Sequence, residues 1–129
     1  MKFEHIAIWV MDLELVKDFY VKYFGMSCSN KYTNAKKQYS SYFLSFKRQE
    51  TRIEIMHRPD MPKFVGNKGM TNGLAHISIS VGSKGKVDEL TETIRNDGYK
   101  VTGEPRTTGD GYYESVILDP EGNYVELSE

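Results

Sequence analysis

The sequence predicts an α+β protein built from two βαβββ modules, whose mixed sheets pair into one curved, partly closed sheet with the helices outside. Segments with period-two hydrophobicity alternate with segments of helical spacing, and their order occurs twice. The chain of 129 residues allows one ordinary domain, whereas a lone unit of roughly 55 residues buries little apolar surface. We therefore expect the two units to pair within one chain, or to exchange with those of a second chain.

The first unit opens with a strand and a helix. Residues 3–10 alternate in polarity, so that Ile6 faces one side of a predicted strand and His5 faces the other. Residues 12–24 instead place their apolar side chains at helical spacing, beginning with an aspartate suited to an N-cap and stopping at Gly25. An amphipathic helix should therefore follow the first strand directly.

The same order returns in the second half of the chain. Residues 74–81 form another alternating segment, with His76 in the third position that His5 holds in the first segment. Apolar residues at helical spacing follow, and Gly98 ends the predicted second helix. The two histidines are separated by 76 − 5 = 71 positions.

The later strands of the two halves also match. Residues 43–46 resemble residues 115–118, and residues 52–55 resemble residues 124–127, both at an offset of 72 positions. A single inserted or deleted residue accounts for the difference from the histidine offset of 71. The internal repeat therefore covers the whole βαβββ unit.

A connector separates the two modules. Residues 59–73 contain two prolines and three glycines with little hydrophobic periodicity, as is typical of a linker. We therefore predict a single domain of residues 1–129, in which module 1 covers residues 1–58 and module 2 covers residues 74–129.

Composition excludes several classes of protein. The 17 Lys and Arg residues nearly balance the 18 Asp and Glu residues, so the formal charge of −1 provides no field for nucleic acid or anionic lipid. No apolar run approaches the roughly 20 residues that cross a bilayer, and we expect a cytoplasmic protein without membrane or nucleic-acid partners. Cys28 is the only cysteine, which excludes an internal disulfide and a thiolate zinc cluster. Any metal must be held by histidines and carboxylates.

Four side chains occupy equivalent places in the two modules: His5, Glu54, His76 and Glu126. The spacing from His to Glu is 49 positions in module 1 and 50 in module 2, and both glutamates alternate with apolar neighbours. Each residue alone fits a solvated surface position, but all four at matched offsets favour one site. Two imidazoles and two carboxylates suit Ni²⁺, Zn²⁺, Co²⁺, Mn²⁺ or Fe²⁺ without choosing among them. His57 has no counterpart in module 2 and is predicted to lie at the surface or at a pocket rim.

Several motifs then occur together along the chain: HIAI at residues 5–8, FY at 19–20 followed by FGM at 24–26, HISI at 76–79, and DPEGNYVEL at 119–127. The last motif has the turn residues that return a chain into a strand, and this strand presents Glu126. With these motifs the chain resembles the vicinal oxygen chelate superfamily, which includes glyoxalases, bleomycin resistance proteins and extradiol dioxygenases. The resemblance covers essentially the whole chain and implies the glyoxalase-like fold.

Among these proteins, the ligand set His, Glu, His, Glu resembles that of glyoxalase I. Extradiol dioxygenases use two His and one Glu, and methylmalonyl-CoA epimerases usually have Gln where this chain has Glu54. The resemblance implies a lyase or isomerase acting on the hemithioacetal of a 2-oxoaldehyde such as methylglyoxal and a thiol, through an enediolate. It assigns Glu126 and Glu54 as catalytic bases. It also implies a homodimer and one divalent ion, with Ni²⁺ or Zn²⁺ ahead of Co²⁺, Mn²⁺ and Fe²⁺.

The identity of the thiol is a separate question. Glutathione-dependent members place an Arg four residues after the first His and an Asn four residues after the first Glu, where this chain has Trp9 and Arg58. We take both as cofactor-binding candidates, because Arg58 suits a carboxylate and Trp9 offers a flat apolar wall. Two alternatives stay open: an extradiol-type dioxygenase or other superfamily enzyme on a different small substrate, and a non-catalytic small-molecule-binding or resistance protein.

Overall fold

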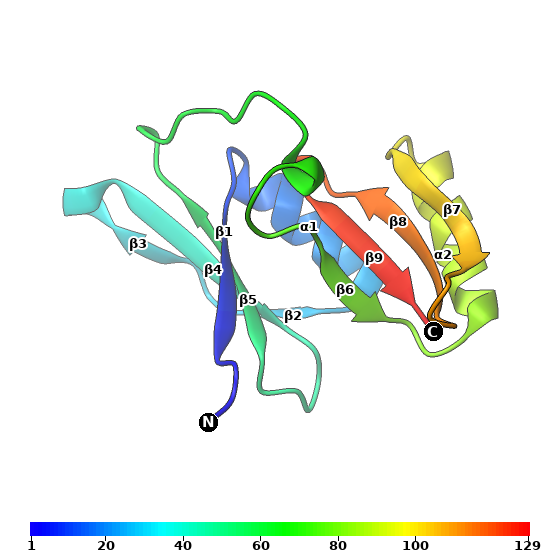
Figure 1. Ribbon diagram of the computed structural model, residues 1–129. Helices are drawn as coiled ribbons and strands as arrows, with labels where there is room; N and C mark the ends of the chain where they lie inside the picture. Colours follow the sequence, from blue (N-terminus) through cyan, green and yellow to red (C-terminus); the bar gives the residue numbers. More distant parts are fainter. The chain divides into compact units, whose positions relative to one another are not determined.

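The computed structural model describes residues 1–129, which form two compact units, Met1–Lys63 and Phe64–Glu129 (Figure 1). The boundary between the units falls inside the segment predicted as a linker. Neither of the two α-helices has the length and apolar composition that a membrane span requires. The first unit contains β1 (His5–Trp9), α1 (Leu13–Phe24), β2 (Ser27–Cys28), β3 (Tyr32–Asn34), η1 (Ala35–Lys37), β4 (Tyr39–Ser45) and β5 (Arg52–His57). The second unit contains η2 (Lys68–Met70), β6 (Ile77–Ser80), α2 (Lys84–Asn96), β7 (Val101–Thr107), β8 (Tyr113–Leu118) and β9 (Tyr124–Ser128).

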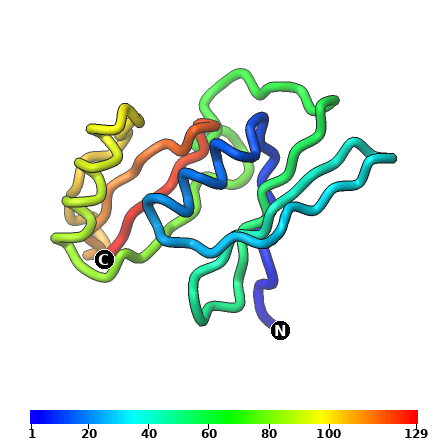
Figure 2. The backbone as a smooth tube through the Cα atoms, turned by 180° about the vertical axis from the view of Figure 1, so that it is seen from behind, coloured from blue at the N-terminus to red at the C-terminus, as the bar shows by residue number.

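The sheet of the first unit has the order β1-β5-β4-β2, and β3 also pairs with β4. β1 and β5 run parallel, whereas the other pairs are antiparallel. Figure 2 shows β3 and β4 as adjacent runs of one hairpin. Between β2 and β3, the Ser29 hydroxyl accepts the backbone N–H of Phe43 at 3.0 Å. This side-chain contact links the segment between β2 and β3 to β4.

The first helix begins and ends where the sequence predicts. Asp12 caps its N-terminus by accepting the N–H of Leu15 at 3.0 Å. Gly25 ends it with a φ of 63°, a left-handed conformation that glycine adopts without steric cost. The helix buries Phe19 and Tyr20 among its apolar side chains, and both are at most 2% exposed.

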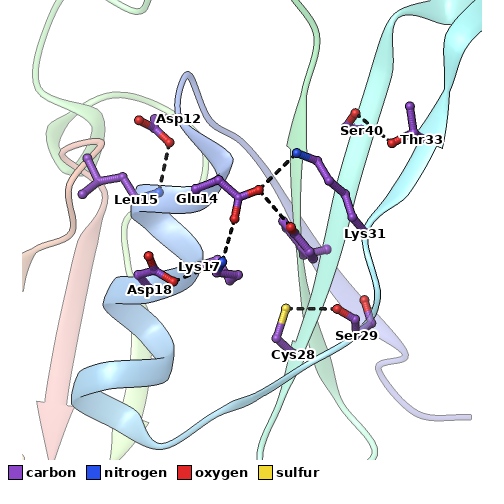
Figure 3. Close-up of polar contacts among 11 residues, drawn as sticks. Asp12, Glu14, Leu15, Lys17, Asp18, Cys28, Ser29, Lys31, Thr33 and Ser40 are labelled. Carbon is purple, nitrogen blue, oxygen red and sulfur yellow. Dashed lines mark hydrogen bonds and ion pairs between the residues drawn. The ribbon is translucent and has the colours of Figure 1, made fainter.

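A charged cluster on the outer side of this sheet fixes α1 against β4. The carboxylate of Glu14 accepts hydrogen bonds from Lys17 at 2.6 Å, Tyr42 at 2.9 Å and Lys31 at 3.1 Å (Figure 3). These bonds, first that from Lys17, lower the pKa of Glu14 to about 2. The cluster therefore joins the helix to β4 and to Lys31, which directly precedes β3, through one ionised carboxylate.

The sheet of the second unit has the order β6-β9-β8-β7, with β6 and β9 parallel. Ser83 caps α2, and Gly98 follows the helix with its N–H donated to the carbonyl of Arg95 at 2.9 Å. The buried face of α2 includes Thr91, whose hydroxyl lies 2.6 Å from that of Ser115 in β8. The helix–sheet interface here therefore contains a buried hydrogen bond.

The two parallel strand pairs have the same register. Ile6 pairs with Ile53 in the first unit, just as Ile77 pairs with Val125 in the second. At the next position of each strand pair, Ala7 is paired with Glu54 and Ser78 is paired with Glu126. The α+β prediction with two βαβββ modules of the glyoxalase-like fold is confirmed.

Two details of the predicted repeat are wrong. The strand predicted at 74–81 begins only at Ile77, because its pairing partner β9 begins at Tyr124 and the pairing starts with Val125. The match of 43–46 with 115–118 is shifted by one residue. Phe43 stands opposite Glu54 and Val116 opposite Glu126, which is an offset of 116 − 43 = 73 instead of 72. Apolar residues stand at neighbouring positions in these strands, so similarity alone did not fix the register.

Candidate metal centre

In the first unit, strand pairing brings His5 and Glu54 together. His5 lies two residues before Ala7 on β1, so it shares the face on which Ala7 and Glu54 stand opposite each other. The imidazole Nε2 lies 3.6 Å from the Glu54 Oε2 atom. The glutamate side chain is only 14% exposed, whereas that of His5 is 38% exposed. In this pair the carboxylate is therefore largely buried, and the imidazole is exposed to solvent.

The second unit repeats this arrangement. His76 immediately precedes β6, and its Nε2 lies 3.4 Å from the Glu126 Oε2 atom. The exposed fractions are 46% for the His76 side chain and 16% for that of Glu126. Each unit therefore presents one imidazole nitrogen beside one carboxylate oxygen, as the spacing of the repeat predicts.

The second oxygen of each carboxylate accepts a hydrogen bond from a hydroxyl group. Tyr39, from β4, donates to Glu54 Oε1 at 2.8 Å, and Ser78, from β6, donates to Glu126 Oε1 at 2.7 Å. Burial raises the pKa of Tyr39 above its ordinary value. Sequence reasoning missed both partners, because Tyr39 falls within a stretch that looks irregular and Ser78 is a common strand residue.

The other ring nitrogen of His5 is also engaged. Nδ1 donates to the carboxylate of Glu4, which in turn accepts from Arg52. These hydrogen bonds, the one from His5 first, lower the pKa of Glu4. A carboxylate on Nδ1 fixes the tautomer of a histidine and leaves Nε2 free as a donor for a metal ion. Glu4 directly precedes His5, which is a signal that sequence reasoning could have used.

A further carboxylate lies beside the second pair. Glu114, on β8, is 13% exposed and contacts Arg106 at 3.2 Å. Burial raises the pKa of Glu114, and the neighbouring Glu126 raises it further. The equivalent residue in the first unit is Ser41. The equivalence follows from strand pairing, in which Ser41 is opposite Met56 and Glu114 is opposite Ser128. Each pair therefore has one additional carboxylate nearby, which contacts the histidine in the first unit and the glutamate in the second.

Trp9 and Arg58, the two predicted cofactor-binding residues, lie in different settings. Trp9 shares the face of His5 on β1 and meets the ring of Tyr39 edge to face, with centroids 6.2 Å apart. Arg58 follows β5 and forms a two-point ion pair with Asp60, in which its Nε lies 2.9 Å from Oδ1. His57 donates from Nδ1 to the carbonyl of Val10 at 3.0 Å. Trp9 thus lies near the first pair, while the Arg58 guanidinium is engaged by a carboxylate.

The donor set fits a divalent metal ion in its chemistry. Imidazole nitrogens and carboxylate oxygens are ligands of borderline divalent ions, and each pair has the supporting hydrogen bonds that such ligands commonly have. Each unit contributes one His–Glu pair. The structure contains no cluster of three or more His, Cys, Asp or Glu side chains suited to a metal ion.

Comparison with known proteins agrees with this fold. Residues 2–127 match the family Glyoxalase/Bleomycin resistance protein/Dioxygenase superfamily. The lactoylglutathione lyase of Escherichia coli O157:H7 is 29% identical over 132 residues, which cover 100% of this chain and 93% of that protein. The Bacillus subtilis protein YqjT, described as uncharacterized, is 27% identical over 95% of this chain and 94% of its own.

Solved structures give the same result. The glyoxalase I of Zea mays superposes with a TM-score of 0.81 at 26% identity, covering 98% of this chain. The match covers 44% of the maize chain, so this protein spans less than half of its length. The chain belongs to the glyoxalase/bleomycin resistance protein/dioxygenase superfamily.

Proposed function

We propose that this protein is a metal-dependent, glyoxalase I-like lyase that isomerises the hemithioacetal of a 2-oxoaldehyde, such as methylglyoxal, and a thiol. The observation that carries the proposal is the occurrence of one His–Glu pair per unit at the same register, with nitrogen–oxygen distances of 3.6 and 3.4 Å. Two carboxylates beside two imidazoles form the ligand set that sequence reasoning linked to glyoxalase I. The lactoylglutathione lyase relative supports the same class of reaction.

His5, Glu54, His76 and Glu126 would hold one divalent ion, with Ni²⁺ or Zn²⁺ as the first candidates. The four residues would come from one chain or from two chains of a homodimer. Such an ion supplies Lewis-acid stabilisation of the negative charge that develops on two neighbouring substrate oxygens. The protein supplies oriented donors and, in the same residues, groups that accept protons.

The reaction moves one proton between neighbouring carbons. One glutamate, Glu126 or Glu54, takes the proton from C1, and the electron pair of the broken C–H bond forms the C1–C2 double bond of an enediolate. A carboxylic acid then returns a proton to C2, the proton of the C1 hydroxyl passes to the oxygen on C2, and C1 becomes the carbonyl of a thioester. Substrate and product are isomers, so no oxidant, reductant or further reactant is needed. Positioned proton transfer of this kind contributes about 10²–10⁴-fold to the rate.

The thiol that carries the substrate is left open by the site residues. The Arg58 guanidinium is paired with Asp60, so a peptide carboxylate would have to compete with that aspartate. Trp9 is 39% exposed and offers its ring to an apolar portion of the substrate. We propose that both residues contact the thiol carrier, which makes thiols other than glutathione part of the test.

Metal removal and replacement test the proposal. Dialysis against a chelator should abolish turnover of methylglyoxal in the presence of a matching thiol, and adding Ni²⁺, Co²⁺ or Zn²⁺ should restore it. Glutathione and a panel of other low-molecular-weight thiols would be assayed in parallel, with metal content measured on each sample. A filled metal site without turnover of any of these thiol adducts would overturn the lyase assignment.

A further inference from the structure

The two candidate metal-binding carboxylates are held in the same way by residues that do not correspond in the repeat. In each unit the Oε2 atom of the glutamate lies beside the histidine Nε2. The Oε1 atom accepts a hydrogen bond from a hydroxyl group. The donor to Glu54 is the phenol of Tyr39, and the donor to Glu126 is the hydroxyl of Ser78.

The donors come from different places in the sheets. Ser78 stands directly opposite Glu126, and the corresponding residue opposite Glu54 is Ala7, which has no hydroxyl. The offset of 73 between β4 and β8 relates Tyr39 to Tyr112, which lies just before β8 and is 60% exposed. The same contact therefore arises twice from unrelated positions, so it is not a by-product of the shared backbone.

We propose that Tyr39 and Ser78 are positioning residues, each of which occupies Oε1 of its glutamate so that Oε2 is the oxygen presented beside the histidine. The inference rests on the proposed metal site. A carboxylate with one oxygen engaged by a hydroxyl binds a metal ion through the other, and loss of such a partner typically lowers metal affinity by about 10- to 100-fold.

Titration with Co²⁺ tests the inference through both affinity and the visible absorption bands of the bound ion. Tyr39→Phe and Ser78→Ala should each weaken Co²⁺ binding by about 10- to 100-fold and shift the absorption bands, because the freed oxygen changes the coordination. The matched controls are Tyr32→Phe, whose ring packs 6.0 Å from that of Tyr39, and Ser80→Ala, two residues further along β6. Both controls should bind as the unmodified chain does.

A rescue experiment separates positioning from a structural role. Ala7 is exposed and stands opposite Glu54, so Ala7→Ser places a hydroxyl where the second unit has Ser78. Added to Tyr39→Phe, it should restore most of the lost affinity and the original absorption bands, whereas a lost packing contact would not return. If Tyr39→Phe fails to fold by circular dichroism, the comparison of Ser78→Ala with Ser78→Thr, which retains a hydroxyl, decides the matter.

The outcomes distinguish the inference from the function on which it rests. Unchanged Co²⁺ affinity and absorption in both Tyr39→Phe and Ser78→Ala would overturn the positioning role while leaving the metal site intact. An unmodified chain that binds no Co²⁺ would overturn the metal site and the positioning role together.

Discussion

The two units carry the same His–Glu pair, the candidate metal ligands, in different surroundings. In the first unit, the ring of Phe43 meets that of His5 edge to face at 5.5 Å, and the Tyr39 phenol lies on Glu54. In the second unit, the serine Ser78 donates to Glu126, and a second carboxylate, Glu114, lies beside it. The comparison teaches that strand register alone is sufficient to bring the donors together, because the pairing is equal where the neighbours are not.

The helix–sheet interfaces of the two units also differ: the first contains more aromatic side chains and the second more hydroxyl groups. The first helix buries the aromatic rings of Phe19 and Tyr20, whose centroids are 5.3 Å apart. The second helix instead buries Thr91, which donates to the carbonyl of Val87 at 2.6 Å and contacts the hydroxyl of Ser115. One interface is therefore held by apolar volume, and the other combines smaller apolar residues with hydrogen bonds.

The largest expected effect comes from replacing either of the two glutamates, which tests whether they are equivalent in the reaction. Glu54→Gln and Glu126→Gln should each lower kcat/KM for the hemithioacetal by about 10²–10⁴-fold, because each removes the carboxylate that the proposal assigns as proton acceptor. Steady-state assays at saturating metal measure this loss. Glu89→Gln, on the exposed side of α2, serves as the control and should retain activity. Full activity of Glu54→Gln would contradict the lyase mechanism and favour a dioxygenase-type ligand set.

The next effect compares the two interfaces. Phe19→Ala should destabilise the protein by about 3–5 kcal/mol, since it removes a fully buried ring. Ser115→Ala should cost only about 1 kcal/mol, because the Thr91 hydroxyl keeps its bond to the Val87 carbonyl. Urea unfolding followed by circular dichroism measures both. Equal losses in the two variants would contradict the proposed difference between the interfaces.

The turns that precede β5 and β9 provide a smaller test. The turn of the first unit contains Arg48 with a φ of 67°, and the turn of the second unit contains Gly122 with a φ of 77°, one position later in the turn. A side chain in this left-handed conformation costs about 1–2 kcal/mol, part of which is offset because glycine loosens the unfolded chain. Arg48→Gly should therefore raise the stability by up to about 1 kcal/mol, and Gly122→Ala should lower it by about 1 kcal/mol. Thermal unfolding that moves both variants in the same direction would contradict this account.

The smallest effect concerns the charged cluster around Glu14 on the first helix. The second helix has a charged contact of its own, between Arg95 and Glu104 at 2.6 Å. The folded pKa of Glu14, about 2, lies below its ordinary value of 4.5. The carboxylate therefore stabilises the fold above pH 4.5, and this contribution is lost as the pH falls toward 2. Because the side chain is 49% exposed, we expect less than about 1 kcal/mol. Thermal midpoints at pH 7 and pH 3 should differ less in Glu14→Gln than in the unmodified chain, and an equal pH dependence would exclude this role.

Much of the fold follows from local patterns. The alternation around His5 and the cap residues of the first helix were read correctly, because both depend on neighbours along the chain. The partners of the glutamates were not predicted. The contact between Tyr39 and Glu54 depends on the register between β4 and β5, and the sequence match of β4 to the second half was shifted by one residue. Contacts across strands require the register itself, which a period-two pattern fixes only where one face is distinctly apolar.

The equal register of the two parallel strand pairs has a consequence for variation in length. Relative to the first unit, the second has 73 − 71 = 2 more residues between its first strand and the strand opposite its glutamate. It then has one residue fewer before the last strand, since 72 − 73 = −1. The His–Glu pair is unaffected by these changes, and longer loops cost little conformational entropy. The loops can therefore differ in length between the units while the parallel strand pairs keep each His–Glu pair in the same register.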